Sequence, residues 1–181
     1  MNHIGELWQL YDLCGERVFD GGFTPAINSP AGRYIVGCAV MLYRFKDGEV
    51  EYLFQKRSAK VWNALKWDVS TGGHINYGEK ATESAVREAR EEIGVTIKPE
   101  NLEFYARFVR GDGIVNLFFY DYTGESGNFE FDDEEVAEVK WVKYSDIEAF
   151  WPNFKELLQN DKFFKISLEE YNEKILKKYE W

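Results

Sequence analysis

The chain has 181 residues, 45% of them hydrophobic and 17% aromatic, which suits a single folded domain and excludes a disordered tail. With 32 acidic and 22 basic residues the formal net charge is −10, which argues against a surface that binds nucleic-acid phosphates or anionic lipid directly. An acidic protein can still bind a polyphosphate when divalent cations bridge the two. The two cysteines, Cys14 and Cys38, have neither CxxC spacing nor a disulfide framework, which suits a reducing compartment.

The start of the chain and its longest apolar stretch carry no targeting signal. Residues 1–6 lack a basic segment followed by an apolar core, so we expect no signal peptide. The apolar stretch at 35–43 is interrupted by Gly37 and is too short to cross a membrane. We therefore expect a cytoplasmic protein with no membrane contact. One domain is expected over 1–181, with a hairpin and loop extension at 1–32 and C-terminal helices at 143–181.

The first third of the chain predicts mainly β-structure. Alternating side chains before residue 20 favour a small hairpin over a short helix. The Gly- and Pro-rich stretch that follows is a loop. A β-rich run then predicts a strand buried on both faces, and a Lys-Asp-Gly turn joins it to the next strand in a hairpin. In chain order the predicted segments are the loop at 21–32, the strand at 33–45, the turn at 46–48 and the strand at 50–55.

The rest of the chain alternates strands with helices. We expect a helix from about residue 80 to residue 93, where Gly94 ends it. Two capping boxes, at 145–148 and 167–170, predict the start of a short helix and of a terminal helix. The terminal helix has an apolar stripe formed by Leu168, Tyr171, Ile175 and Tyr179. Strands are expected at 68–71, 102–109, 114–122 and 138–142, with a turn at 111–113. This order predicts an α/β fold, a mixed sheet with helices packed on it.

The helix at 80–93 has an unusual acidic face. At about 100° per residue, Glu91 and Glu92 fall on either side of Glu88. These carboxylates repel one another and lie near the helix C-terminus, where the helix dipole disfavours anions, so a bound cation is a natural compensation. Oxygen ligands favour Mg²⁺ or Mn²⁺. The alternative is a solvated charged face. The residues expected to face the core are Thr82, Val86, Ala89 and Ile93.

The surroundings of these glutamates resemble a known family. The segment reads Gly73-x5-Glu79-x7-Arg87-Glu88-Ala89-x-Glu91-Glu92-x-Gly94-Val95, and it matches every fixed position of the Nudix hydrolase signature Gx5Ex7REUxEExGU, in which U is apolar. The resemblance implies a Nudix-like α/β/α sandwich. It also implies metal-dependent hydrolysis of a diphosphate bond in a nucleoside diphosphate linked to another moiety, a small-molecule substrate.

The resemblance also implies roles for individual residues. Glu88, Glu91 and Glu92 would bind Mg²⁺ or Mn²⁺, with the backbone carbonyl of Gly72 as a further ligand. One glutamate would act as the base, either in this segment or on a later loop. Glu79 and Arg87 would orient the catalytic glutamate; plain helix electrostatics is the alternative. The candidate catalytic residues are Glu79, Arg87, Glu88, Glu91 and Glu92.

Candidates outside the signature are an acidic loop and several aromatic residues. The stretch at 131–141 resembles a loop that supplies a further ligand or base, although such loops are usually just solvated. Its candidates are Glu134, Glu135 and Glu138, and we favour Glu135. Trp62, Trp67 and Tyr77 could stack on a base or ring, or could simply belong to the core. The candidate substrate-binding residues are Arg57, Trp67 and Tyr77.

A looser resemblance, over about 6–142, is to the Nudix subgroup of isopentenyl-diphosphate isomerase. The isomerase needs a cysteine at the position that Gly72 occupies, and several metal-binding histidines, whereas this chain has only His3 and His74. We therefore expect His74 to be a hydrogen-bonding loop residue. Three functions stay open: a Nudix hydrolase, which we favour, an isomerase, and a catalytically silent binding module. No nucleic-acid partner is expected, and a homodimer is compatible with the sequence.

Overall fold

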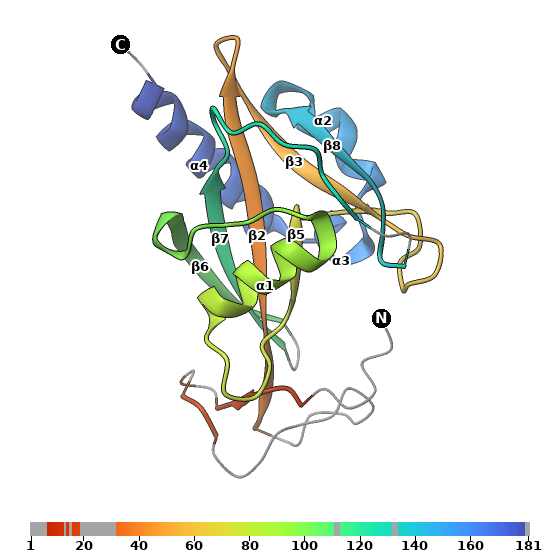
Figure 1. The fold of residues 1–181 in the computed structure, drawn as a ribbon, viewed down its shortest axis with the longest axis vertical. Coiled ribbons are helices and arrows are strands. Elements are labelled where there is room, and N and C mark those ends of the chain that lie inside the picture. Colours follow the sequence, from red (N-terminus) through yellow and green to blue (C-terminus); the bar gives the residue numbers. More distant parts are fainter. Residues whose placement is uncertain are drawn as a thin grey trace.

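The computed structural model of the protein describes residues 7–12, 14, 16–18, 32–110, 113–131 and 134–179. Across these residues one mixed sheet runs through the molecule, with α1 on one face and α4 on the other (Figure 1). The strands are β1 Leu10–Tyr11, β2 Tyr34–Lys46, β3 Glu49–Arg57, β4 Trp67–Asp68, β5 Thr71–His74, β6 Leu102–Arg110, β7 Gly113–Asp121 and β8 Val136–Lys143. The α-helices are α1 Ala81–Ile93, α2 Ile147–Phe150, α3 Glu156–Gln159 and α4 Lys162–Tyr179.

The long strand β2 is the centre of the sheet. It pairs in parallel with β7 along one edge, and antiparallel with β3 and then β5 along the other. The main strand order is β4-β3-β2-β7-β6, while β8 pairs with β3 and β1 with β2. The predicted α/β class with a mixed sheet is confirmed. Since β5 leads directly into the loop before α1, its pairing with β2 fixes where that helix begins.

The alternation of side chains along β2 divides the core into two layers. Met41 and Tyr43 face the layer that contains α4, whereas Val40 and Leu42 face the layer that contains α1. All four are buried, as expected for a strand covered on both faces. The sheet therefore serves as a rigid support that holds α1 by its apolar side.

Helix α1 follows the sequence prediction at both ends. The carboxylate of Glu83 accepts a hydrogen bond from the Lys80 N–H at 2.8 Å, and Gly94 ends the helix with a φ of 70°. The predicted core face needs correction. Thr82 and Val86 are only half-buried, because the face that meets the sheet is rotated from the predicted one. The buried residues of α1 are Ser84, Ala85, Ala89, Glu92 and Ile93.

Three predictions of local structure were wrong. The strand expected at 68–71 is two strands, because Asp68 pairs with β3 while 71–74 pairs with β2. Ser145 caps no helix, since its hydroxyl bonds Glu49 and a 3₁₀ turn precedes α2. Ser167 lies inside α4, where it donates to the Phe163 carbonyl at 2.8 Å.

The terminal helix begins earlier than predicted. Its start is at Lys162, where the Asp161 carboxylate accepts a hydrogen bond from the Phe164 N–H at 2.9 Å. The predicted stripe is correct, and its first three residues, 168, 171 and 175, are buried against the sheet.

The described part of the N-terminal segment turns back on itself as a hairpin would. Leu10–Tyr11 pairs with β2, and the Val18 N–H donates to the Leu10 carbonyl at 2.9 Å. Most of the predicted loop, 21–31, and residues 111–112 of the predicted turn lie outside the described residues. No helix in the described ranges has the length and apolar character needed to cross a membrane.

We expect Tyr171 to anchor α4 to the sheet. Its ring stacks on Phe119 with centroids 3.6 Å apart, and its hydroxyl donates to Glu103 at 2.8 Å. Tyr171→Ala should lower the free energy of unfolding by about 3–5 kcal/mol through cavity formation. The control is Phe163→Ala on the same helix, whose side chain is exposed, and it should change stability by less than about 0.5 kcal/mol. Urea denaturation measures both, and equal effects would contradict this anchor.

Candidate functional site

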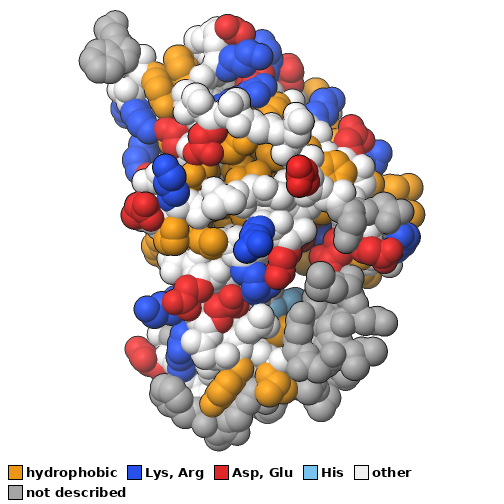
Figure 2. All heavy atoms as spheres, in the orientation of Figure 1, with side chains coloured by type: hydrophobic (Ala, Val, Ile, Leu, Met, Phe, Trp, Pro, Cys, Tyr) orange, Lys and Arg blue, Asp and Glu red, His pale blue; other side chains and the backbone are white. Residues whose placement is uncertain are grey.

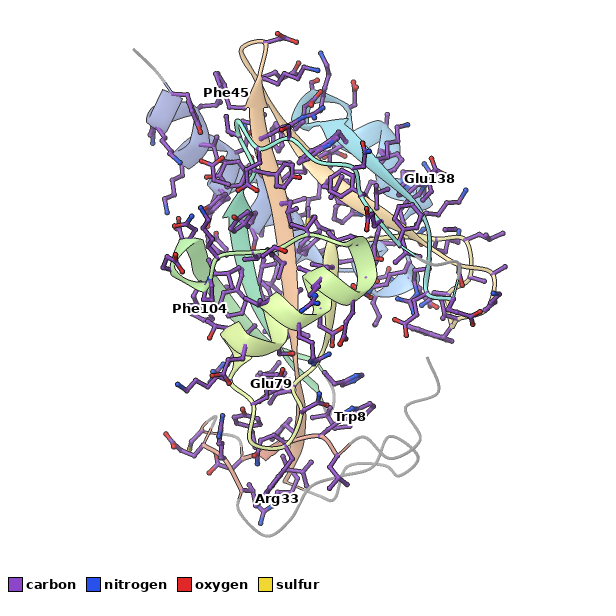
Figure 3. The ribbon with its side chains drawn as sticks, viewed as in Figure 1. Trp8, Arg33, Phe45, Glu79, Phe104 and Glu138 are labelled. Atoms are coloured by element: carbon purple, nitrogen blue, oxygen red, sulfur yellow. The ribbon has the colours of Figure 1, made fainter. Side chains whose placement is uncertain are left out.

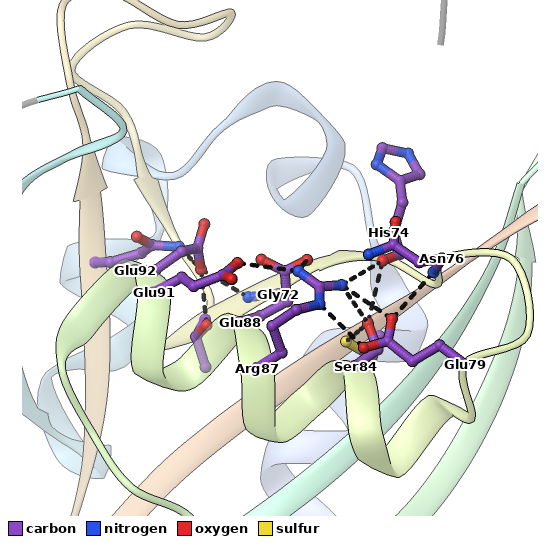
Figure 4. Close-up of polar contacts among 12 residues, drawn as sticks. Gly72, His74, Asn76, Glu79, Ser84, Arg87, Glu88, Glu91 and Glu92 are labelled. Atoms are coloured by element: carbon purple, nitrogen blue, oxygen red, sulfur yellow. Dashed lines mark hydrogen bonds and ion pairs between the residues drawn. The ribbon is translucent and has the colours of Figure 1, made fainter. Parts of the chain in front are cut away.

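Arg87 on α1 connects three carboxylates. Its guanidinium donates to both oxygens of Glu79 at 3.0 and 3.1 Å, to Glu88 at 2.8 Å and to Glu91 at 3.0 Å (Figure 4). It also donates to the backbone carbonyl of His74 at 3.0 Å. Burial alone would lower the pKa of Arg87, but the bonds to Glu79 and Glu88 hold it above its ordinary value. The guanidinium is therefore a fixed positive charge in the middle of the site.

Glu79 ties Arg87 to the loop before α1. Both oxygens of its carboxylate bind the guanidinium, and Oε2 also accepts a hydrogen bond from the Asn76 N–H at 3.0 Å. The Arg17 side chain donates to the Glu79 carbonyl at 2.6 Å. Such a bidentate pair restrains the guanidinium in direction as well as in position. This geometry suits the orienting role expected of Glu79 and Arg87.

Glu92 is the most deeply buried glutamate of the site. One of its oxygens, Oε2, accepts hydrogen bonds from Thr71 Oγ1 at 2.7 Å, from the Gly72 N–H at 2.9 Å and from Gln55 Nε2 at 3.1 Å. Burial, followed by the charge of Glu88, raises the pKa of Glu92 to about 8, against the lowering effect of the bonds from Thr71 and Gly72. Sequence reasoning missed Thr71 and Gln55, because their role depends on the packing of β3 and β5 against α1.

Glu88 is also held in a poorly hydrated position. Its side chain is 12% exposed. Burial outweighs the lowering effect of Arg87, so the pKa of Glu88 is raised to about 7. Glu91 and Glu135 add further negative charge and raise the pKa. Burial disfavours the charged form of both carboxylates, and a cation bound between them would offset that cost.

The donor groups suit a hard divalent cation. Glu88, Glu91 and Glu92 supply only oxygen atoms, and each has one oxygen outside the hydrogen bonds given above. Gln55 Oε1, on the side chain that bonds Glu92, is buried without a hydrogen-bond partner. In the described ranges no three acidic, His or Cys side chains surround a common point. Arg87 binds one oxygen each of Glu88 and Glu91.

Two neighbouring glycines of β5 are in contacts too close for a side chain. A Cβ on Gly73 would lie 2.2 Å from Glu88 Oε1, and a Cβ on Gly72 would lie 2.4 Å from the backbone oxygen of Cys38. Gly73 is thus needed to leave room for the Glu88 carboxylate, and Gly72 is needed for the pairing of β5 with β2. The Gly72 result also bears on the isomerase, because this backbone leaves no room for the cysteine that an isomerase would carry there.

A cavity of about 530 Å³ lies beside the carboxylates. Its polar part includes Gly72, three of the α1 glutamates (Glu88, Glu91 and Glu92), and Glu134 and Glu135 just before β8. Acidic and basic side chains lie side by side on the surface near α1 (Figure 2). The apolar part of the cavity is lined by residues that include Phe108, Val115, Leu117, Leu158 and Phe164. The cavity can therefore accommodate a molecule with a charged portion and a less polar portion.

The structure brings some of the predicted binding residues to this cavity and not others. Arg57 lines it and donates to the Trp62 carbonyl at 2.8 Å; Trp62 lines it as well. Trp67 is buried in the core, where its ring packs against that of Phe150 with centroids 5.1 Å apart. It is therefore not placed to stack on a substrate ring. Tyr77 is exposed on the loop before α1, and the cavity lining formed by the described residues does not include it.

The three glutamates expected from the acidic loop also differ in their position relative to the cavity. Glu135 lines the cavity, as favoured from the sequence. Glu134 also lines it, but its carboxylate pairs with Lys60 at 2.8 Å. Glu138 pairs with Lys56 at 3.6 Å and lies at the outer edge of the sheet (Figure 3). His74 offers its carbonyl to Arg87, while its ring stacks on Trp8 with centroids 3.6 Å apart.

Comparison with known proteins agrees with this geometry. The model of the NUDIX domain family matches residues 33–161. The chain is 32% identical over 126 residues to Nudix hydrolase 3 of Arabidopsis thaliana, which covers 62% of this chain and 16% of that protein. It is 30% identical over 119 residues to an isopentenyl-diphosphate Delta-isomerase of Ruegeria pomeroyi, covering 61% of this chain and 64% of that one. The chain thus spans less than two thirds of either relative.

A solved structure shows the same fold. The crystal structure of a Deinococcus radiodurans protein matches with a TM-score of 0.67 at 21% identity, over 92% of this chain and 99% of that chain. The α/β/α sandwich expected from the sequence is therefore confirmed.

We expect the two neighbouring glycines to fail in different ways. Gly73→Ala places a methyl group against the Glu88 carboxylate, a flexible group that can swing away, so the fold should persist while affinity for Mn²⁺ falls about tenfold or more. Gly72→Ala meets backbone instead and should cost about 1–3 kcal/mol of stability. Metal titration and urea denaturation separate the two effects. Unchanged Mn²⁺ affinity in Gly73→Ala would contradict the prediction that Glu88 is a metal ligand.

Proposed function

This chain belongs to the Nudix family, and we propose that its site hydrolyses a diphosphate bond in a nucleoside diphosphate linked to another moiety, with Mg²⁺ or Mn²⁺ as cofactor. The observation that carries this proposal is the set of α1 carboxylates at the wall of a cavity, two of them with pKa values raised by burial. A diphosphate is repelled by these groups alone and attracted once a divalent cation lies between them. The family assignment supports the same reaction.

The metal ligands in this proposal are Glu88, Glu91, Glu92 and the carbonyl of Gly72. Glu135, just before β8, is a further ligand. The metal would neutralise phosphate charge and acidify the attacking water. Thr71 and the Gly72 N–H hold one oxygen of Glu92 in place, which leaves its other oxygen for the metal. These buried donors keep the carboxylate oriented before any ligand arrives.

Arg87 and Glu79 act on the other carboxylates in this proposal. Because Arg87 donates to Glu88 and Glu91 at once, it sets the spacing of the two side chains along α1. A carboxylate must also accept the proton of the attacking water. Glu91, whose side chain is 43% exposed, and Glu135 both line the cavity and are our candidates for this role. Arg57 would bind a substrate phosphate.

The two alternatives find less support. The similarity to an isomerase does not extend to its cysteine, because Gly72 stands at that position in a backbone with no room for a side chain. A silent binding module would not need the complete set of oriented carboxylates. Hydrolysis is therefore the function that we favour.

Removal of divalent metal should abolish the activity. Protein treated with EDTA should release no phosphate or pyrophosphate from nucleoside diphosphate derivatives, and added Mg²⁺ or Mn²⁺ should restore release, because the carboxylates alone repel the substrate. The readout is phosphate release across a panel of such compounds. Turnover that survives thorough chelation would exclude this mechanism.

Replacement of the ligand carboxylates should separate activity from stability. Glu88→Gln and Glu92→Gln keep the side-chain volume but remove a negative ligand, so kcat/KM should fall about 10²-fold or more. In EDTA, Glu92→Gln should be at least as stable as the unmodified protein, since burial disfavours the Glu92 carboxylate.

The matched control for these variants is Glu83→Gln, on the exposed first turn of the same helix, where the amide oxygen can still cap Lys80. It should retain full activity. Near-normal turnover in both ligand variants would favour the silent module.

A further inference from the structure

The cavity wall carries a second charged group, which the signature does not include. It consists of Arg57, Asp68 and Lys155, all of which line the cavity together with the glutamates. Asp68 is 2% exposed, and its carboxylate accepts a hydrogen bond from Lys155 Nζ at 2.6 Å and a longer one from Arg57 at 3.4 Å. Both contacts are to the same oxygen, Oδ2. A single buried carboxylate therefore holds two cations.

The orientation of Asp68 is fixed from its other side. Its second oxygen, Oδ1, accepts a hydrogen bond from the Val69 N–H at 2.8 Å. Asp68 also pairs with Gln55 of β3, the residue that bonds Glu92. Through Gln55, the charged group is therefore next to the carboxylate site.

The C-terminal part of the chain delivers Lys155 to this position. Phe154 is fully buried and forms a bridge with Trp67, next to Asp68. The Lys155 N–H donates to the Trp67 carbonyl at 2.8 Å, and the Lys155 carbonyl accepts from Leu158 at 3.0 Å. Because backbone and side chain are both held, the ammonium has a defined position although it is 87 residues from Asp68 in the sequence.

The charges of this group are opposite to those of the rest of the polar wall. Two cations share one carboxylate, so the group has a net positive charge, whereas α1 and the start of β8 contribute only glutamates and Arg87. The ammonium and the guanidinium each offer more N–H donors than these contacts use. The combination of fixed cations with spare donors suits the oxygen atoms of a phosphate.

We propose that Lys155, together with Arg57, forms a phosphate-binding subsite for the phosphate of the substrate that is not attacked. This inference rests on the proposed function. It assigns to Lys155 and Arg57 a part in binding the substrate's diphosphate that is separate from that of the metal ligands. Asp68 acts through the two cations as a positioning residue. The subsite takes any diphosphate, organic or inorganic.

Binding of imidodiphosphate, a diphosphate analogue with a P–N–P link, tests the subsite without requiring turnover. In the presence of Mg²⁺, calorimetric titration of Lys155→Met should show affinity about 10- to 100-fold weaker than that of the unmodified protein, from loss of a charge-assisted hydrogen bond. Lys155→Arg should stay within about threefold, since it keeps the cation. The matched control, Lys165→Met, removes an exposed lysine that pairs with Glu148, and it should bind normally.

A double variant distinguishes phosphate binding from a merely structural role. Lys155→Met alone leaves the buried oxygen Oδ2 of Asp68 with only the long contact to Arg57, which destabilises the protein. Lys155→Met combined with Asp68→Asn removes both charges. If Lys155 binds phosphate, the double variant stays weak. If Lys155 only neutralises Asp68, the double variant regains normal affinity, and the proposal is overturned. Unfolding curves confirm that each variant is folded at the assay temperature.

Turnover provides the second readout. On a compound that the protein hydrolyses, Lys155→Met should raise KM by a similar factor and change kcat far less, because the contact is to the phosphate that is not attacked. A loss confined to kcat would overturn the subsite. The protein could hydrolyse none of the compounds while Lys155→Met still weakens the binding of imidodiphosphate. In that case the subsite stands and the proposed hydrolysis fails.

Discussion

The positive charge of Arg87 is the constraint on which the arrangement of the site depends. Glu79, Glu88 and Glu91 all meet it, and they come from the loop before α1 and from two positions along the helix. Without this guanidinium, like charges on one helix face would separate or take up protons. The loop and the helix therefore have a defined position relative to each other, and the Arg87 bond to the His74 carbonyl ties both to the end of β5.

The site combines a rigid support with unfavourable local electrostatics. The apolar side of α1 packs on β2 and β7, so the helix is stable enough to hold Glu88 and Glu92 in poorly hydrated positions. Burial disfavours the charged form of both carboxylates, and hydrogen bonds from Thr71 and Gly72 offset only part of that cost. An arrangement that costs stability in isolation is typical of binding sites, where the ligand supplies the missing charge.

The C-terminal segment connects the two layers of the molecule at the cavity. Its buried aromatic residues belong to the layer on the far side of the sheet from α1, yet the same segment places Lys155 on Asp68. The apolar residues Leu158 and Phe164 continue this wall away from the charged groups. The cavity is thus lined by β5 and α1 of the signature segment on the one hand, and by residues from the C-terminal part of the chain on the other.

Local sequence determined the elements whose signals lie within a few residues of one another. The span of α1, its glycine stop and its acidic face follow from helical periodicity and from the properties of Gly94, which takes a left-handed conformation. The buried run of β2 follows from composition in the same way. The family resemblance, carried by the spacing of 73–95, pointed to the carboxylates that the structure places at the cavity. Capping signals were less informative, because Ser145 and Ser167 found other partners.

Only the tertiary structure decided which distant residues meet. It buried Trp67 in the core, although the sequence allowed a place at the site, and it brought Gln55 and Thr71 to Glu92. It also moved the start of the last helix to Lys162, which is next to the capping carboxylate of Asp161. The pairing of Lys155 with Asp68 spans 87 residues and depends on the register of the intervening strands. Such contacts leave no periodic pattern in the sequence, because they are set by how β2 aligns β3, β5 and β7 around it.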